Sequence, residues 1–208
     1  MRRLSPLESG TGPTIHHAGR EVILLSSNDY LGLATHPEVI RAAIHATEQY
    51  GTGSGASRLV SGTLPPHTHL ETSLATFKGT EAALLFGAGY LANIGIIPNL
   101  IGQGGLILAD RLCHASLIDG CRLSRADLRV FRHRDCAHLE SLLRRRSASR
   151  PTLIITEGLF SMDGDLAPLS DLASLAERYE ATLYVDDAHG TGIMGPSGRG
   201  TVEHFGLE

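Results

Sequence analysis

The chain of 208 residues has no tryptophan, one lysine, three cysteines and no long uninterrupted apolar run. A membrane-spanning helix needs about 20 consecutive, mostly apolar residues, so no membrane span is predicted. Cys113, Cys121 and Cys136 match no CxxC pattern, and an odd number of cysteines favours a reducing compartment. The first residues also lack the apolar core of a signal peptide. We therefore expect a cytoplasmic protein.

The charge balance is mildly acidic, with 18 Lys and Arg against 22 Asp and Glu and a formal net charge of −4. This balance does not favour a nucleic-acid partner. Hydrophobic residues make up 42% of the chain, enough for one sizeable core. We predict an N-terminal arm with a short strand over residues 1–35 and a main domain over residues 36–208.

Apolar runs alternate with helical patterns along most of the main domain. Pro37 and Gly51 suit the first turn and the end of one helix. Near-continuous apolar strands that alternate with helices are typical of a mostly parallel sheet with helices on both faces, an α/β fold. The strands are predicted at 82–86, 106–110, 128–133, 152–158 and 181–187, and the helices at 37–50, 65–79, 90–102, 114–124, 136–146 and 169–180.

Ligands of such sheets gather at the carboxyl ends of the strands, so the residues after each strand are informative. After 82–86, Gly89 and Tyr90 open a helix whose backbone N–H groups suit a phosphate, although a plain turn explains them as well. After 106–110, His114 lies near another helix start, where it could act as a ligand-binding imidazole or simply as a helix cap.

Two further strand ends carry polar clusters. Ser161 lies in a loop with Asp163 and Asp165, which could form a turn or offer metal ligands. Asp186 and Asp187 end the last strand. Because successive strand side chains point to opposite faces, only one of these acids can face a ligand there. Such a carboxylate can hold a protonated ring nitrogen, and the nearby His189 could donate to an oxygen of the same ring.

Together these groups suit an anionic, aromatic, nitrogen-containing cofactor. Pyridoxal 5′-phosphate (PLP), whose protonated pyridine serves as an electron sink, is the economical candidate. A metal hydrolase is the competing reading, with Asp186, Asp187, His189 and the loop 161–165 as its site. That reading predicts metal-dependent stability and no affinity for PLP.

Six segments, in the expected order from about residue 20 onward, resemble the α-oxoamine synthases. These PLP enzymes condense an amino acid with an acyl-CoA, losing CO₂ and CoA. The resemblance implies the large domain of PLP-dependent fold type I and a homodimer. The segments are "SSNDYLGLATHPEV", "GSGASRLVSGT", "HTHLETSLATFKGTEAALLF", "HASLIDG", "TEGLFSMDGDLAPL" and "YVDDAHGTGIMGPSGRG".

Within this family, "DDAHGTG" and "FSMDGD" are most similar to the 8-amino-7-oxononanoate synthase branch of biotin biosynthesis. That branch joins alanine to a pimeloyl thioester, carried by CoA or an acyl carrier. The serine palmitoyltransferase-like and glycine C-acetyltransferase-like branches are the alternatives.

The resemblance also implies roles for single residues. Asp186 would contact the pyridine nitrogen and Asp187 would pair locally, while Arg2, Asn28 and His114 would contact substrate. His114, Asp186 and His189 would be the catalytic residues. No metal site is implied. The cofactor-binding residues would be Gly89 and Tyr90 at the phosphate, His114 over the ring, Ser161 and His189 at the phenolic oxygen, and Asp186.

The family's Schiff-base lysine lies on a strand that follows the "VDDAHGTG" segment. The only lysine here, Lys78 in "TFKGTEAA", matches an ordinary helix-end position of the family. We therefore expect the lysine segment and the small C-terminal domain to be absent from these 208 residues, and the chain alone to be inactive or nearly so. In an alternative reading, the chain is a lysine-less, non-catalytic subunit that lends residues such as Asn28 to a complete partner.

Overall fold

The computed structural model describes residues 6–8, 10 and 12–208, which fall into two compact units, Met1–Leu70 and Glu71–Glu208. Helix α2 (Pro65–Lys78) runs across the boundary between them. The predicted division after residue 35 stays a prediction. No described helix combines the length and the apolar composition that a membrane crossing requires.

The first unit contains a hairpin and a long helix. Strands β1 (Thr14–His17) and β2 (Arg20–Ile23) pair antiparallel across a turn whose two residues, Ala18 and Gly19, both have positive φ, as a tight hairpin turn requires. A short 3₁₀ helix, η1 (Leu33–Thr35), then leads to α1 (Pro37–Tyr50).

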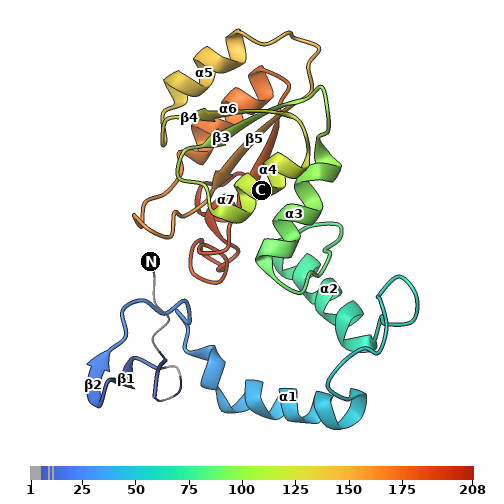
Figure 1. Cartoon of the computed structure of the whole chain (residues 1–208), viewed down its shortest axis with the longest axis vertical. Coiled ribbons are helices and arrows are strands. Elements are labelled where there is room, and N and C mark those ends of the chain that lie inside the picture. The colour runs from blue at the N-terminus through green and yellow to red at the C-terminus, as the bar shows by residue number, and fades with distance from the viewer. Residues whose placement is uncertain (1–5, 9, 11) are drawn as a thin grey trace. The chain divides into compact units, whose positions relative to one another are not determined.

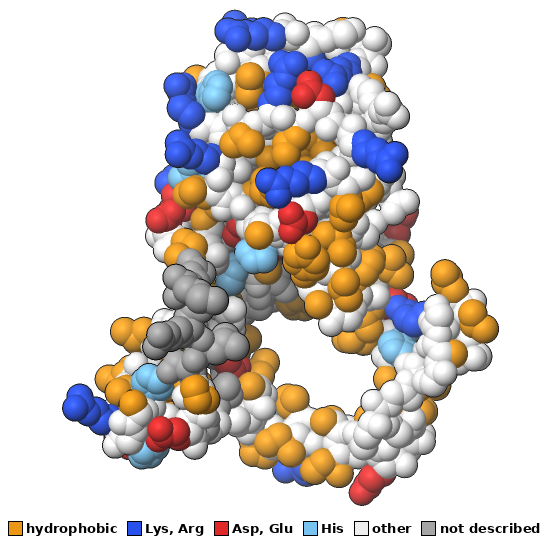
Figure 2. Space-filling model, viewed as in Figure 1, with side chains coloured by type: hydrophobic (Ala, Val, Ile, Leu, Met, Phe, Trp, Pro, Cys, Tyr) orange, Lys and Arg blue, Asp and Glu red, His pale blue; other side chains and the backbone are white. Residues whose placement is uncertain are grey.

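Helix α1 begins and ends where the sequence predicts. The His36 ring accepts a hydrogen bond from the Glu38 backbone N–H at 3.3 Å, and Gly51, with φ of 80°, ends the helix. None of its residues is buried. Figure 2 shows apolar side chains exposed in this part of the chain, and those on α1 include Val39, Ile40 and Ile44.

The second unit is built on a parallel four-stranded sheet in the order β4-β3-β5-β6 (Figure 1). The helices that cover it are α3 (Gly89–Leu100), α4 (Ala115–Leu123), α5 (Cys136–Arg144) and α6 (Leu169–Arg178), and a short helix α7 (Thr201–His204) follows. The strands are β3 (Leu106–Asp110), β4 (Asp127–Phe131), β5 (Thr152–Glu157) and β6 (Thr182–Asp186).

Two cores form because neighbouring residues of each buried strand point to opposite faces. Leu108 and Ile154 belong to a core with α5 and α6, whereas Ile107 and Ile155 belong to a core with α3 and α4. The predicted α/β fold, with a parallel sheet and helices on both faces, is confirmed.

The prediction of a strand at 82–86 is wrong for this structure. A strand needs a ladder partner, and none of the described strands pairs with this run. The Leu85 backbone N–H donates to the Glu71 carboxylate at 2.8 Å. Phe86 lies against α3, where a Cβ added at Gly95 would come within 3.0 Å of its ring. An apolar run alone does not distinguish a strand from a packed, irregular segment.

Substitutions in the central strands should destabilise the fold most, because these strands contribute side chains to both cores. Ile154 on β5 is 0% exposed, whereas Val130 on the edge strand β4 is 47% exposed. We expect Ile154→Ala to lower the free energy of unfolding by about 2–5 kcal/mol because it leaves a cavity. The control Val130→Ala should cost under about 1 kcal/mol. Urea denaturation measures both, and equal losses would contradict the assignment of the core.

Candidate active site

A cavity of about 290 Å³ lies where the ends of β5 and β6 meet the first turns of α3 and α4. Its walls contain every predicted cofactor-binding residue except Ser161. The lining residues are Gly89, Tyr90, Ala92, Asn93, His114, Ser116, Glu157, Tyr184, Val185, Asp186, Asp187, Ala188 and His189. The structure thus brings Gly89, Tyr90, His114, Asp186 and His189 together from three separate segments of the chain.

Asp186 holds its carboxylate at this cavity through two hydrogen bonds. One oxygen accepts from the Ala188 backbone N–H at 3.1 Å, and the other accepts from the Asn93 side-chain amide at 2.8 Å. An ionised carboxylate has about four acceptor positions, so Asp186 keeps capacity for a donor inside the cavity.

Asn93 connects Asp186 to the His114 side. Its amide nitrogen also donates to the Ser116 hydroxyl at 2.9 Å, and its oxygen accepts from the Tyr184 hydroxyl at 2.8 Å. Because Asn93 is 5% exposed and its two N–H groups are both used, its orientation is fixed by the network. Burial, with a smaller contribution from the charge of Asp186, raises the pKa of Tyr184 to about 12, so its hydroxyl stays a donor.

The same network sets the tautomer of His114. Ring atom Nδ1 accepts from the Ser116 backbone N–H at 3.2 Å and lies 2.7 Å from the Ser116 hydroxyl, which is the second donor. A neutral His114 therefore carries its proton on Nε2. His114 is also the N-cap of α4. The two alternatives predicted from the sequence, a helix cap and a ligand-binding imidazole, are therefore compatible.

Glu157, the last residue of β5, anchors the backbone of His114. Its carboxylate accepts the His114 N–H at 2.6 Å, and it also accepts the Ser161 N–H. Burial raises the pKa of Glu157, and the negative charge of Asp186 adds to this effect, while the two N–H donors oppose it.

The start of α3 also lines the cavity. Its N-cap residue, Ala88, supplies no side-chain cap, and a Cβ added at Gly89 would meet nothing within 4 Å. First-turn N–H groups and the positive end of the helix dipole here favour an anion. Next to it, the Tyr90 hydroxyl donates to Asp119 at 3.0 Å, and this hydrogen bond raises the pKa of Tyr90.

Asp187 has a different set of partners. Its carboxylate accepts the Thr201 hydroxyl at 2.6 Å and the Thr201 backbone N–H at 3.0 Å, and the Lys78 ammonium lies 3.7 Å away. The glycine at position 200, with φ of 112°, is required because a Cβ there would collide with this carboxylate. Asp186 and Asp187 thus contact different parts of the structure.

The structure does not test the roles of three predicted site residues. Ser161 lies on the loop 159–166 and is not among the lining residues. Asn28 belongs to the first unit, and Arg2 lies outside the described residues. Their roles stay predictions. The described residues contain no group of three or more His, Cys, Asp or Glu side chains that could hold a metal, so the metal-hydrolase reading gains no support.

Sequence reasoning missed Asn93, Ser116, Tyr184 and Glu157. Glu157 carried a signal, since it is an acid at the end of a predicted strand like Asp186. Asn93 lies one helical turn after Gly89, which places it on the same side of α3. Nothing in the local pattern singles out Ser116 or Tyr184.

The different partners of the two adjacent acids lead to a test. We expect Asp187→Asn to lower the free energy of unfolding by about 1–3 kcal/mol, because an amide group would face the donors of Thr201 or Lys78. In the matched change Asp186→Asn, the new amide would also face a donor, that of Ala188 or Asn93, but the change removes repulsion with Glu157. This relief should offset the penalty and keep the loss under about 1 kcal/mol. Urea denaturation measures both. A larger loss for Asp186→Asn would contradict this division.

Comparisons with known proteins show the family of the chain. The pattern of the family described as aminotransferase class I and II matches residues 20–206. The chain is 56% identical over 204 residues to an 8-amino-7-oxononanoate synthase of Geobacter sulfurreducens, covering 98% of this chain and 52% of that protein. It spans about half the length of the curated relatives that it matches.

Two groups of solved structures have the same fold. Serine palmitoyltransferase from S. paucimobilis, with bound PLP and myriocin, superposes with a TM-score of 0.95 at 38% identity, over 99% of this chain and 52% of that one. An 8-amino-7-oxononanoate synthase from Francisella tularensis superposes with a TM-score of 0.73 at 31% identity, over 88% and 50% of the two chains. The chain belongs to the aminotransferase class I and II family.

Proposed function

We propose that the cavity is a PLP site, and that the chain forms the cofactor-tuning part of a PLP-dependent acyltransferase. The carrying observation is that Asp186, His114 and the start of α3 line one cavity. The relatives support this proposal by their names, and the serine palmitoyltransferase structure by its bound PLP.

The donor set fits the chemistry of PLP. The phosphate suits the uncapped N–H groups at Gly89, and the protonated pyridine nitrogen suits the carboxylate of Asp186. The cavity volume of about 290 Å³ lies at the lower end of the range for small-molecule sites. PLP in such a site supplies an electron sink through its protonated ring.

The residues of this chain would then divide the work. Asp186 would keep the proton on the pyridine nitrogen, because an ion pair raises the pKa of that nitrogen. His114, with Nδ1 occupied by Ser116, would present Nε2 to the ring and the substrate. His189 would contact the phenolic-oxygen side of the ring. Ser161, whose backbone N–H is bound by the cavity residue Glu157, would contact the same side.

The reaction that we propose is the decarboxylative condensation of an amino acid with an acyl thioester. Alanine and a pimeloyl thioester are favoured, because the curated relatives carry the name 8-amino-7-oxononanoate synthase. A serine palmitoyltransferase-like reaction is the alternative that the solved structures favour. We further propose a cytoplasmic homodimer, to which Asn28 and Arg2 would add substrate contacts. The apolar exposed face of α1 supports an interface of this kind.

PLP binding tests the cofactor proposal directly. Equilibrium dialysis of the purified chain should detect binding, and Asp186→Asn should weaken it roughly tenfold to a hundredfold, the equivalent of one to two pKa units of lost charge interaction. Asp163→Asn removes the same charge from an exposed loop residue outside the cavity and serves as the control. Absence of PLP binding, or equal affinities for the two variants, would refute the proposal.

A second test concerns Lys78. Its ammonium donates to the Thr191 hydroxyl at 2.8 Å and to the Arg199 carbonyl, and it lies 3.7 Å from Asp187. Because these contacts occupy the amine, we expect PLP to bind without joining Lys78. Borohydride reduces a Schiff base between PLP and a lysine to a stable bond. After this treatment, peptide mapping should find Lys78 unlabelled. Stoichiometric label on Lys78 would show that it is the covalent anchor.

A further inference from the structure

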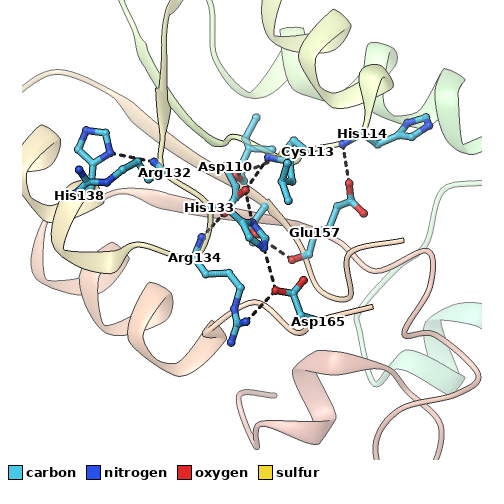
Figure 3. A network of polar contacts seen from close by, with 12 residues as sticks. Asp110, Cys113, His114, Arg132, His133, Arg134, His138, Glu157 and Asp165 are labelled. Carbon is cyan, nitrogen blue, oxygen red and sulfur yellow. Dashed lines mark hydrogen bonds and ion pairs between the residues drawn. The ribbon is translucent and has the colours of Figure 1, made fainter. Parts of the chain in front are cut away.

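A second polar cluster lies where the ends of β3 and β4 meet the loop 159–166 (Figure 3). At its centre is His133, which follows β4. Its Nδ1 lies 2.9 Å from an Asp110 carboxylate oxygen, and its Nε2 lies 3.0 Å from an Asp165 carboxylate oxygen. The His133 ring also packs edge-on against Phe160, with ring centroids 4.5 Å apart.

Asp110 joins two of the strand-end turns. One of its oxygens accepts the Leu112 backbone N–H at 2.9 Å as well as His133, and the other accepts the Arg134 backbone N–H at 2.9 Å. The turn that begins at Asp110 leads directly to His114. Because Asp110 is 1% exposed, these hydrogen bonds have no competition from solvent.

Asp165 connects this cluster to the loop 159–166. Its Oδ2 accepts from both His133 and the Arg134 guanidinium, the latter at 2.8 Å, while its Oδ1 is buried with no hydrogen-bond partner among the described residues. The loop closes on itself through the Phe160 N–H, which donates to the Asp165 carbonyl at 2.9 Å. Ser161 is the residue after Phe160.

Two carboxylates on the two ring nitrogens require two N–H donors. A neutral imidazole has only one, so one nitrogen lone pair would face a carboxylate oxygen. The contact geometry is therefore satisfied by the imidazolium form. Among the described residues, the charged groups that contact it are Asp110 from β3 and Asp165 from the loop, with Arg134 of its own turn on the far side of Asp165.

We propose that His133 is a positioning residue of the active site. Its imidazolium, held between Asp110 and Asp165, fixes the two loops that carry His114 and Ser161, and this clamp loosens when the ring loses a proton. The clamp involves only loops of this chain and does not depend on a ligand. Its effect on cofactor affinity rests on the proposed function.

The direction of the pH dependence follows from the contacts. Burial alone would lower the pKa of His133, but the hydrogen bonds and charges of the two aspartates raise it. The clamp therefore contributes its full stability below the unfolded histidine pKa of about 6.5 and loses it as the pH rises through the higher folded value. Asp165, whose pKa is lowered by His133 and Arg134 despite burial, contributes above about pH 3.9 and loses its contribution as the pH falls through the lower folded value.

Hydrogen exchange on the full chain tests the clamp without any ligand. In the unsubstituted chain, the protection factors of the Phe160 and Gly164 amides should fall about tenfold or more as His133 deprotonates, as expected for a lost hydrogen bond between charged groups. In His133→Gln these amides should be weakly protected at every pH. The Ile154 amide of the core should be unchanged in both, which separates loop opening from unfolding.

Asp165→Asn is the discriminating variant. The new side-chain amide can donate to Nε2 of a neutral ring while Nδ1–H still donates to Asp110. The loop should therefore stay protected at high pH, and the NMR titration of His133 should move toward the ordinary histidine value. His204→Gln is the control, because His204 has a similar edge-on ring contact, with Phe205. This control should keep the protection pattern of the unsubstituted chain.

PLP affinity measured over the same pH range completes the experiment. We expect it to fall with His133 deprotonation in the unsubstituted chain, and to be low in His133→Gln and pH-independent in Asp165→Asn. The clamp would be overturned if Asp165→Asn and the unsubstituted chain had the same loop protection and the same His133 titration. Normal clamp behaviour with no PLP binding at any pH would instead refute the proposed function. A clamp that titrates while PLP affinity stays constant would refute the positioning role alone.

Discussion

The site depends on one repeated interaction, the hydrogen bond between a loop N–H group and a carboxylate at the end of a strand. Three of the four parallel strands end in an acid: Asp110, Glu157 and Asp186. Each carboxylate accepts backbone N–H groups of the loops around it, from Leu112, His114 and Ala188 respectively. The spacing of the strands in the sheet thus fixes the positions of the irregular loops that follow them.

Three carboxylates at one edge of a sheet repel one another, so each needs a compensating partner. Asp110 is paired with His133, and Asp186 is held by the amide of Asn93. Glu157 accepts the backbone N–H groups of His114 and Ser161, and burial, with a smaller contribution from the charge of Asp186, raises its pKa. The least compensated charges therefore lie at the cavity, where a cationic group of a ligand would relieve the repulsion.

The fold was predictable where local patterns and tertiary packing agree. The bounds of α1 follow from Pro37 and Gly51, and the central strands β3 and β5 follow from runs whose residues are all buried. The failure at 82–86 has the opposite cause, because the run is apolar but has no ladder partner in the described chain.

The site was predictable in part for the same reason. Residues at strand ends can be found from the strand pattern, which led to His114, Asp186 and His189. Asn93 could not be found in this way, because its importance comes from contacts with Asp186, Ser116 and Tyr184, which are distant in sequence. Likewise, the sequence pattern assigns His133 to a strand, and its importance comes from a contact with Asp165, which is distant in sequence.

The cavity has a polarity that restricts its ligand. In one part of the lining, the uncapped start of α3 offers N–H groups and the positive end of a helix dipole. In another part, Asp186 and Glu157 contribute two carboxyl groups, and the charge of Asp186 adds to the effect of burial in raising the pKa of Glu157. A purely anionic ligand would be repelled by the acids, and a purely cationic one by the helix start. A flat molecule with a phosphate at one end and a protonated nitrogen at the other would suit both groups, and its positive charge would offset the repulsion between Asp186 and Glu157.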